Sequence, residues 1–414
     1  MNPESTLTTT PTTPACRLCG ERANWLGNHI VEVHGMGLEG YLALYPGAPL
    51  ASEAAIKEMT GRVDRVTKVL PPPVSEVTTD FAGVSTPVNW DVPSDACLPL
   101  PKAYRVPQHG HLAQDVQAAV ISLACGRSTY IWGEAGSGKD AVIHAWSYYG
   151  QRPAKMFQIQ PGVDTKAWFF SQAIGANETY WEEGDLLRAV RDGYTTSTGR
   201  VLPYLILISD VDRAKQDQME ALRLMLDSIE GRVMGPLGEV YKILPGTQFV
   251  FTANTAGGGD ASRGRYTSSN VIDASILDRF ERVFQFHWMD WKDEEVVVRE
   301  KFPVLVQRVP WVFEQVGKAT AALRAAISKD ELYAEFSHRA VCAWLGNVAD
   351  ILTVSKQVPG NLLRVGFRAY ADKLSDEETR QAAEKLIDAH IKGGALDVGA
   401  GATTGTAPAS GRMR

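Results

Sequence analysis

The stretch from Ile131 to Asp140 has the residue types and spacing of a site that handles phosphate. It reads Ile-Trp-Gly-Glu-Ala-Gly-Ser-Gly-Lys-Asp, so the pattern GxxxxGK runs from Gly133 to Lys139. Glycines let the backbone curl with its N–H groups pointing inward, and the lysine supplies a mobile positive charge. An apolar run precedes the loop and a helical pattern over residues 141–149 follows it. The motif predicts a phosphate-binding loop between a strand and a helix. Its expected contact residues are Gly133, Glu134, Ala135, Gly136, Ser137, Gly138, Lys139 and Asp140.

A second apolar run, residues 205–208, ends in Ser209-Asp210-Val211-Asp212. Enzymes that cleave nucleoside triphosphates on such a loop need a neighbouring strand with one residue for Mg²⁺ and one that polarises water. Counting along the run places Ser209 at the Mg²⁺ position and Asp210 at the catalytic position. A second register, which we rank lower, takes Asp210 for the metal and Asp212 as the base.

Asp140 and Ser209 both depart from the usual pattern, which has a hydroxyl after the loop lysine and an aspartate on the strand. We therefore hypothesise an exchange in which Asp140 supplies the carboxylate and Ser209 the hydroxyl to Mg²⁺, since this ion accepts both oxygen types. The alternative is a site that binds nucleotide and hydrolyses it slowly or not at all.

Three more polar residues follow in an informative order. Asn254 ends a third apolar run and is expected to orient the attacking water near the γ-phosphate. Arg279 follows a short helical segment. Arg339 lies in the first turn of a helix for which Ser337 is a suitable N-cap.

The order of these motifs over residues 105–390 resembles the AAA+ ATPases of the MoxR-like branch, with CobS-like and CbbQ/NorQ-like members. A short helix at 184–193 and a hairpin at 230–243 resemble the same branch. The resemblance implies an α/β P-loop NTPase with a parallel-sheet core and a C-terminal helical lid, using ATP and Mg²⁺. It also implies an ATPase whose catalytic residues are Asp210, Asn254 as first sensor, Arg339 as second sensor, and Arg279 as a finger acting on the neighbouring subunit. Arg263, Arg265 and Arg282 are rival candidates for the finger.

Near the N-terminus, Cys16 and Cys19 are followed by His29 and His34. Two thiolates from a turn and two imidazoles one helical turn apart predict a closed, structural Zn²⁺ site. The segment resembles zinc fingers of the MucR/Ros type from bacteria and phages. Its charged residues cancel, which favours protein docking or weak nucleic-acid contact, and a DNA-reading role stays open.

Composition limits the remaining choices. The chain has 414 residues, 44% of them hydrophobic, and a formal net charge of −6. These values predict a globular protein of two or three domains without general affinity for nucleic acid. We expect no membrane span and no signal peptide. Five cysteines, two of them with zinc spacing, suit a reducing cytoplasm, or the host cytoplasm for a phage-encoded chain.

The pattern along the chain predicts six segments. They are a disordered leader (1–15), the zinc finger with its following helix (16–58), a Pro-rich linker (59–104), the α/β ATPase core (105–289), the helical lid (290–392) and a disordered tail (393–414). Within the core, residues 160–183 are rich in aromatic side chains. We expect them to pack at helical spacing, with contact to a substrate chain as the alternative.

Three functions follow from these expectations. The first is an ATP-driven ring, expected to be hexameric, that remodels a client protein and uses the finger for targeting. A partner with a von Willebrand factor A-like domain is implied by analogy. The second is a DNA-directed motor or phage-type replication factor. The third is a nucleotide-binding scaffold with little turnover.

Overall fold

The computed structural model describes residues 13–23, 26–46, 48–52, 77–160, 162–174, 179–227, 231–259, 266–355, 359–374 and 376–391. The chain divides into two compact units, Met1–Val74 and Ser75–Arg414. Most of the predicted leader and all of the predicted tail lie outside the described residues.

The described residues of the first unit form two short helices, α1 (Gly27–His34) and α2 (Leu38–Leu44). Gly35 ends α1 in the left-handed conformation, a common helix stop. The unit has a very small core, in which the side chains of Leu26, Ile30 and Tyr41 are fully buried.

The second unit is built on a parallel five-stranded sheet with the order β13-β3-β12-β9-β4. The strands are β3 (Thr129–Gly133), β4 (Ala154–Gln158), β9 (Leu205–Ser209), β12 (Gln248–Ala253) and β13 (Arg282–Phe286). All residues of β9 and β12 are buried. This burial explains why both strands read as apolar runs rather than alternating patterns, since the sheet is covered on both faces.

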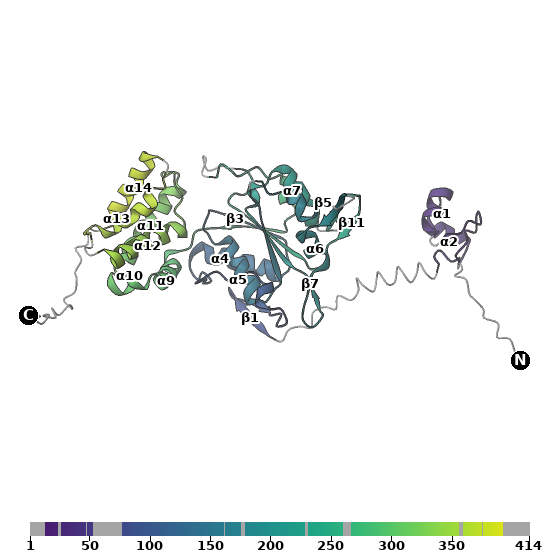
Figure 1. Cartoon of the computed structure of the whole chain (residues 1–414), viewed down its shortest axis with the longest axis horizontal. Helices are drawn as coiled ribbons and strands as arrows, with labels where there is room; N and C mark the ends of the chain where they lie inside the picture. Colours follow the sequence, from purple (N-terminus) through teal and green to yellow (C-terminus); the bar gives the residue numbers. More distant parts are fainter. Residues whose placement is uncertain are drawn as a thin grey trace, which may run out of the picture. The chain divides into compact units, whose positions relative to one another are not determined.

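Helices cover the two faces of the sheet (Figure 1). On one face Leu205 and Leu207 pack with residues of α4 (Gly110–Ala124) and α5 (Lys139–Tyr149). On the other, Ile206 and Ile208 pack with residues of α6, α7 and α8. These helices span Asp185–Asp192, Gln216–Arg223 and Ala274–Leu277. The predicted α/β fold with a parallel core is confirmed.

Among the described residues of this part of the chain there are also four hairpins and four short 3-10 helices. The hairpins are β1–β2 (Thr78–Phe81, Val84–Pro87), β5–β6 (Phe170–Ile174, Thr179–Glu183), β7–β8 (Tyr194–Thr195, Val201–Leu202) and β10–β11 (Arg232–Met234, Val240–Lys242). The 3-10 helices are η1 (Ser94–Ala96), η2 (Thr165–Trp168), η3 (Val211–Arg213) and η4 (Leu224–Leu226).

Residues 77–104 belong to this second unit. Phe81 of β1 is buried against the aromatic rings of Tyr104, Trp146 and Tyr149. The sequence predicts a linker over 59–104, and its described part, residues 77–104, packs within the second unit. Residues 59–76 of the predicted linker lie outside the described residues. The prolines of this segment do not prevent folding, because the apolar residues between them are buried on α4 and α5.

The aromatic-rich insertion forms η2 and the β5–β6 hairpin instead of an α-helix, but some of its aromatic side chains are part of the core, as expected. Trp181 pairs with Gln172 across the hairpin, and Tyr180 pairs with Ala173. Period-two geometry puts Tyr180 and Trp181 on opposite faces of a two-stranded ribbon, and both side chains are exposed. Phe169, just before the hairpin, is buried.

In the described part of the C-terminal region, the second unit forms six helices. They are α9 (Trp291–Lys301), α10 (Pro303–Arg308), α11 (Val312–Ser328), α12 (His338–Val354), α13 (Leu362–Ala371) and α14 (Glu377–His390). Their apolar faces share one core around Phe313, Phe336, Trp344 and Phe367. The predicted helical C-terminal region is confirmed. Among the described helices, none is long and apolar enough to cross a membrane.

Candidate nucleotide and metal sites

The glycine loop connects β3 to α5, as its sequence predicts. A Cβ atom on Gly133 would lie 2.1 Å from the carbonyl oxygen of Phe286 on the neighbouring strand. Gly136 has a φ of +75°, and a Cβ atom there would lie 2.7 Å from Cβ of Ser337. Both positions therefore require glycine, the first for strand packing and the second for contact with the start of α12.

Lys139 opens α5 with a buried side chain. Its Nζ atom donates to the carbonyl oxygens of Gly133 at 2.7 Å and Glu134 at 3.1 Å, and to Oδ1 of Asn254 at 3.2 Å. Burial lowers the pKa of Lys139, and the carboxylates of Asp140, Asp212, Asp210 and Glu335 oppose that effect. The lysine and Asn254, predicted to serve one site, are thus in direct contact.

Asp140 lies in the first turn of α5 and interacts with the central strand β12. Its Oδ1 atom accepts a hydrogen bond of 2.6 Å from the hydroxyl of Thr252. Ser209, the other member of the predicted exchange, is fully buried at the end of β9. Its hydroxyl has no hydrogen-bond partner among the described residues. Sequence reasoning missed Thr252, which reads simply as a β-branched strand residue.

Asp210 and Asp212 have different surroundings. Asp210 adopts a left-handed backbone with φ of +56°, and its Oδ2 atom accepts from Nε2 of Gln158 at 2.9 Å. Asp212 is fully buried, and its Oδ2 atom accepts from the amide of Asn254 at 3.1 Å and the hydroxyl of Ser269 at 2.7 Å. The Asp212 carboxylate is therefore buried and bonded to the backbone of Asn254. Asp210 is only half-buried, so it is the better candidate for a carboxylate that contacts water.

Side chains from outside the loop form hydrogen bonds with both the amide and the carbonyl of Ala135. Its amide donates to the hydroxyl of Tyr266 at 3.2 Å, and its carbonyl accepts from Nε1 of Trp288 at 3.4 Å. The Tyr266 hydroxyl in turn donates to Glu335 at 3.3 Å. None of these three side chains belongs to a recognisable motif, so sequence analysis did not predict a role for them.

The start of α12 is fixed by a buried charged network. Glu294 of α9 is fully buried and contacts Arg324 at 2.7 Å and Nδ1 of His338 at 2.9 Å. Burial alone would raise the pKa of Glu294, but His338 and Arg324 outweigh it and lower that pKa. Ser337 is the N-cap residue of α12 without a side-chain capping bond, and Arg339 is exposed in the first turn. Arg339 therefore lies two residues from the side chain that contacts Gly136.

Arg279 lies at the opposite edge of the sheet from Lys139. It lines a hollow of about 260 Å³ together with Ser128 and Thr247, which precede β3 and β12. Its guanidinium donates to the carbonyl of Ser275. Of the rival arginines, Arg282 is exposed at the start of β13. Arg263 and Arg265 lie outside the described residues.

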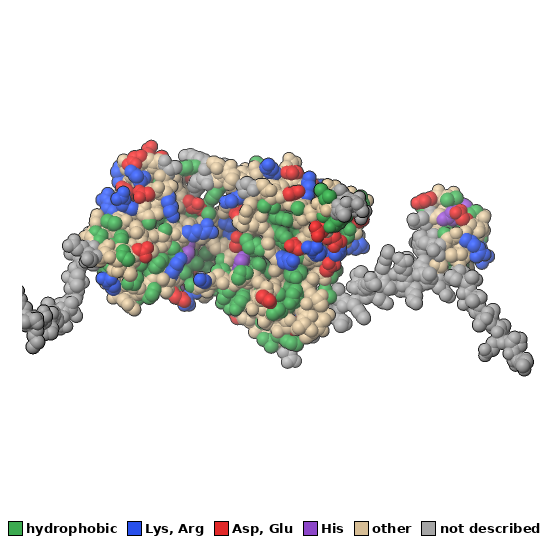
Figure 2. All heavy atoms as spheres, in the orientation of Figure 1, with side chains coloured by type: hydrophobic (Ala, Val, Ile, Leu, Met, Phe, Trp, Pro, Cys, Tyr) green, Lys and Arg blue, Asp and Glu red, His purple; other side chains and the backbone are tan. Residues whose placement is uncertain are grey.

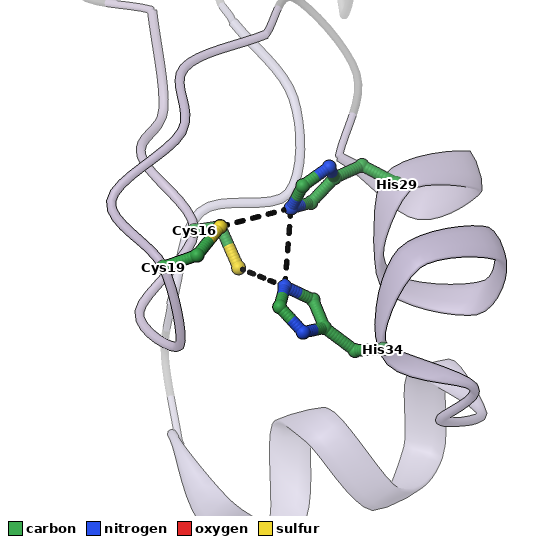
Figure 3. Close-up of side chains that lie close together, drawn as sticks. All are labelled: Cys16, Cys19, His29 and His34. Carbon is green, nitrogen blue, oxygen red and sulfur yellow. Dashed lines mark hydrogen bonds between the residues drawn. The ribbon is translucent and has the colours of Figure 1, made fainter.

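The first unit brings its four predicted zinc ligands together (Figure 3). One donor atom from each of Cys16, Cys19, His29 and His34 lies within 4.8 Å of the others. The cysteines lie on a tight turn and both histidines on α1. Nδ1 of His29 is 3.2 Å from Glu21, an outer carboxylate that can orient the ring with Nε2 toward a metal. Two sulfur and two nitrogen donors at this spacing fit tetrahedral Zn²⁺.

Comparison with known families identifies the core of the second unit. Residues 128–280 match the family of AAA domains described as the dynein-related subfamily. This chain contains an AAA domain. A comparison with curated proteins finds no match.

Solved structures similar to this chain include two of RuvB from Thermotoga maritima. One is a point mutant with 13% identity and a TM-score of 0.40, covering 65% of this chain and 70% of that chain. Another is described as a Holliday junction branch migration motor, with 13% identity and a TM-score of 0.39, covering 65% and 69%. At such low similarity these structures carry no information on what this protein acts on.

An AAA domain implies the use of nucleotide and Mg²⁺, and the oxygen atoms around the glycine loop fit both. Loop amides, the α5 N-terminus and Lys139 are suited to the phosphates of a nucleotide. Asp140 and the unpartnered hydroxyl of Ser209 are hard oxygen donors of the kind that Mg²⁺ takes. When bound, Mg²⁺ would neutralise phosphate charge beside Lys139.

Proposed function

We propose that this protein is an ATP-hydrolysing AAA+ motor of the MoxR-like type that assembles into a ring and remodels a partner protein. One observation carries the ring part of the proposal: Lys139 and Arg279 lie at opposite edges of the same sheet. The five residues of β3 separate these edges by about 16 Å. This separation exceeds the reach of an arginine side chain, so Arg279 would serve the nucleotide of a neighbouring subunit.

Within one subunit, each polar group of the site has a distinct role. Lys139 and the loop amides bind the phosphates, and Asp140 and Ser209 hold Mg²⁺. Asp210, next to the buried end of β9, activates the attacking water, and Asn254 positions it. Arg339 reports the nucleotide to the lid, because α12 begins against the loop at Gly136 and Ser337. A hexamer is the expected ring.

Exposed apolar hairpins support the proposed action on a protein client. Ile174 and Trp181 of β5–β6, and Leu237 in the β10–β11 turn, are exposed, with Ile174 88% accessible. Apolar side chains presented on hairpins can contact the chain of a client without a specific sequence. A von Willebrand factor A-like partner belongs to the same proposal by family analogy.

The zinc finger is proposed to target this motor to its client. Arg17 and Arg22 are balanced by Glu21 and Glu32 within the finger. On the face of the second unit shown in Figure 2, basic and acidic side chains are interspersed. Groove binding to nucleic acid requires a basic surface, so this distribution favours a protein target.

Mixing two inactive variants tests the shared site. Lys139→Ala removes nucleotide binding in its own subunit but keeps Arg279, and Arg279→Ala does the reverse. Each variant alone is expected to lose ATPase activity, and a mixture should regain part of it because some interfaces combine an intact loop with an intact arginine. A mixture as inactive as its components would contradict a finger acting between subunits.

A further inference from the structure

The Asp140 carboxylate is held in a fixed orientation by a hydrogen bond to one of its two oxygen atoms. The hydroxyl of Thr252 donates to its Oδ1 atom at 2.6 Å, within the range typical of a hydroxyl bonded to an ionised carboxylate. Thr252 is almost fully buried and Asp140 is half-buried, so this bond is partly shielded from water. The threonine thus holds one carboxylate oxygen and leaves the other to bind something else.

Strand register places a second oxygen donor beside Thr252. Phe251 of β12 pairs with Ile208 of β9, so the next residues, Thr252 and Ser209, are neighbours. Val250 and Leu207, two residues earlier on each strand, pack on the α5 side of the sheet. Because side chains alternate along a strand, Thr252 and Ser209 also face α5, on strands about 4.8 Å apart.

Ser209 is fully buried, and its hydroxyl has no partner among the residues that the structure describes. A buried hydroxyl without a hydrogen bond is unfavourable, so its presence indicates a ligand that completes it. A carboxylate oxygen and a hydroxyl oxygen converging at the end of a sheet are suited to a divalent cation of the Mg²⁺ or Mn²⁺ type.

The charge around the loop lysine gives this cation a further role. Lys139 is a single ammonium, and the carboxylates that act on it are Asp140, Asp212, Asp210 and Glu335. These carboxylates oppose the attraction of a triphosphate to Lys139 and the loop amides, and a divalent cation would offset their charge. A serine or threonine at the position after the loop lysine, as in the usual pattern, would carry no charge. Asp140 places an extra negative charge there.

Building on the proposed nucleotide site, we infer that Asp140, oriented by Thr252, binds a divalent cation directly in the absence of nucleotide, and that ATP binds only when this cation is present. Thr252 is then a positioning residue, and the cation adds positive charge to that of Lys139. The order of binding differs from that of a loop in which the metal arrives already bound to the phosphates.

Mn²⁺ binding to nucleotide-free, Zn²⁺-loaded full-length protein tests the first half of this inference, with electron paramagnetic resonance reporting free Mn²⁺. Asp140→Asn is expected to abolish the site, and Thr252→Val to weaken it roughly ten-fold, the scale seen when a group supporting a metal ligand is removed. Thr129→Val is the matched control, because Thr129 is equally buried but lies at the opposite edge of the sheet. Unchanged Mn²⁺ affinity in Asp140→Asn would overturn the inference, and this variant decides the test if Thr252→Val fails to fold.

Binding of a fluorescent ATP analogue to the Zn²⁺-loaded protein, with or without added Mg²⁺, tests the second half. Wild-type protein should bind the analogue only with Mg²⁺, and Asp140→Thr should gain binding without it. Equal wild-type affinity in both conditions would overturn the cation requirement while leaving the proposed nucleotide site intact. No binding in either condition would instead overturn the proposed function.

Discussion

The buried network around Glu294 should determine both the stability of the helical region and the strength of nucleotide binding. Glu294 receives two hydrogen bonds from Arg324, at 2.7 and 3.1 Å, and one contact from His338 at 2.9 Å. Arg324 also donates to the carbonyls of Met289 and Phe336. One carboxylate thus joins α9, α11 and the start of α12, which contacts the glycine loop.

Glu294→Ala would leave the Arg324 guanidinium, only 11% exposed, without its counter-charge. Removing one partner of a buried ion pair typically costs about 3–5 kcal/mol. The matched control is Glu314→Ala, because Glu314 pairs with Lys318 on an exposed surface and should cost below about 0.5 kcal/mol. Replacing both charges, as in Glu294→Leu with Arg324→Met, should cost much less than the two single changes combined.

Urea unfolding followed by circular dichroism measures these differences, and fluorescent ATP binding measures their effect on the loop. We expect Glu294→Ala to weaken nucleotide binding under conditions where the protein is still folded, because Ser337 loses its fixed position. Stability losses of similar size in Glu294→Ala and Glu314→Ala would refute the reasoning. Equal nucleotide affinity in wild type and Glu294→Ala would refute the link to the loop.

Two further predictions concern metal and pH. Chelation of Zn²⁺, or Cys16→Ser, should unfold the first unit, because its core is too small to hold the fold without the metal. The thermal transition of the second unit should stay unchanged. Protease resistance of residues 13–52 after chelation would contradict this prediction. Burial disfavours charged His338, but its bonds to Cys342 and Glu294 outweigh burial and raise its pKa to about 9. The imidazolium then stabilises the fold fully below the ordinary pKa of 6.5, and this contribution is lost as pH rises through about 9. The difference in free energy of unfolding between wild type and His338→Asn should therefore shrink as pH rises from 6.5 to about 9. A difference that grows with pH would contradict this prediction.

Much of the fold could be predicted because the decisive patterns are local. The apolar runs ending at Trp132, Ile208 and Asn254 are long enough to be buried strands, and the glycine loop can lie only between a strand and a helix. The four zinc ligands are similarly close in sequence, so their spacing already predicts that they converge.

The parts that sequence reasoning missed depend on contacts between distant segments. Thr252 bonds to Asp140 across 112 residues, and Tyr266 reaches Glu335 across 69. A short sequence motif cannot predict either contact, because the two partners lie far apart in the sequence. The β5–β6 hairpin was expected to be helical because aromatic residues fit both periodicities over a short window. Tyr180 and Trp181 are exposed there, whereas burial was the expectation and contact with a substrate chain the alternative.

The most direct test of the proposed motor is steady-state ATP hydrolysis with Mg²⁺, at protein concentrations that favour assembly, beside Lys139→Ala. We expect clear turnover in wild-type protein that disappears in the variant. Tight ATP binding by the wild type without turnover would contradict it, and would identify the protein as a nucleotide-binding scaffold.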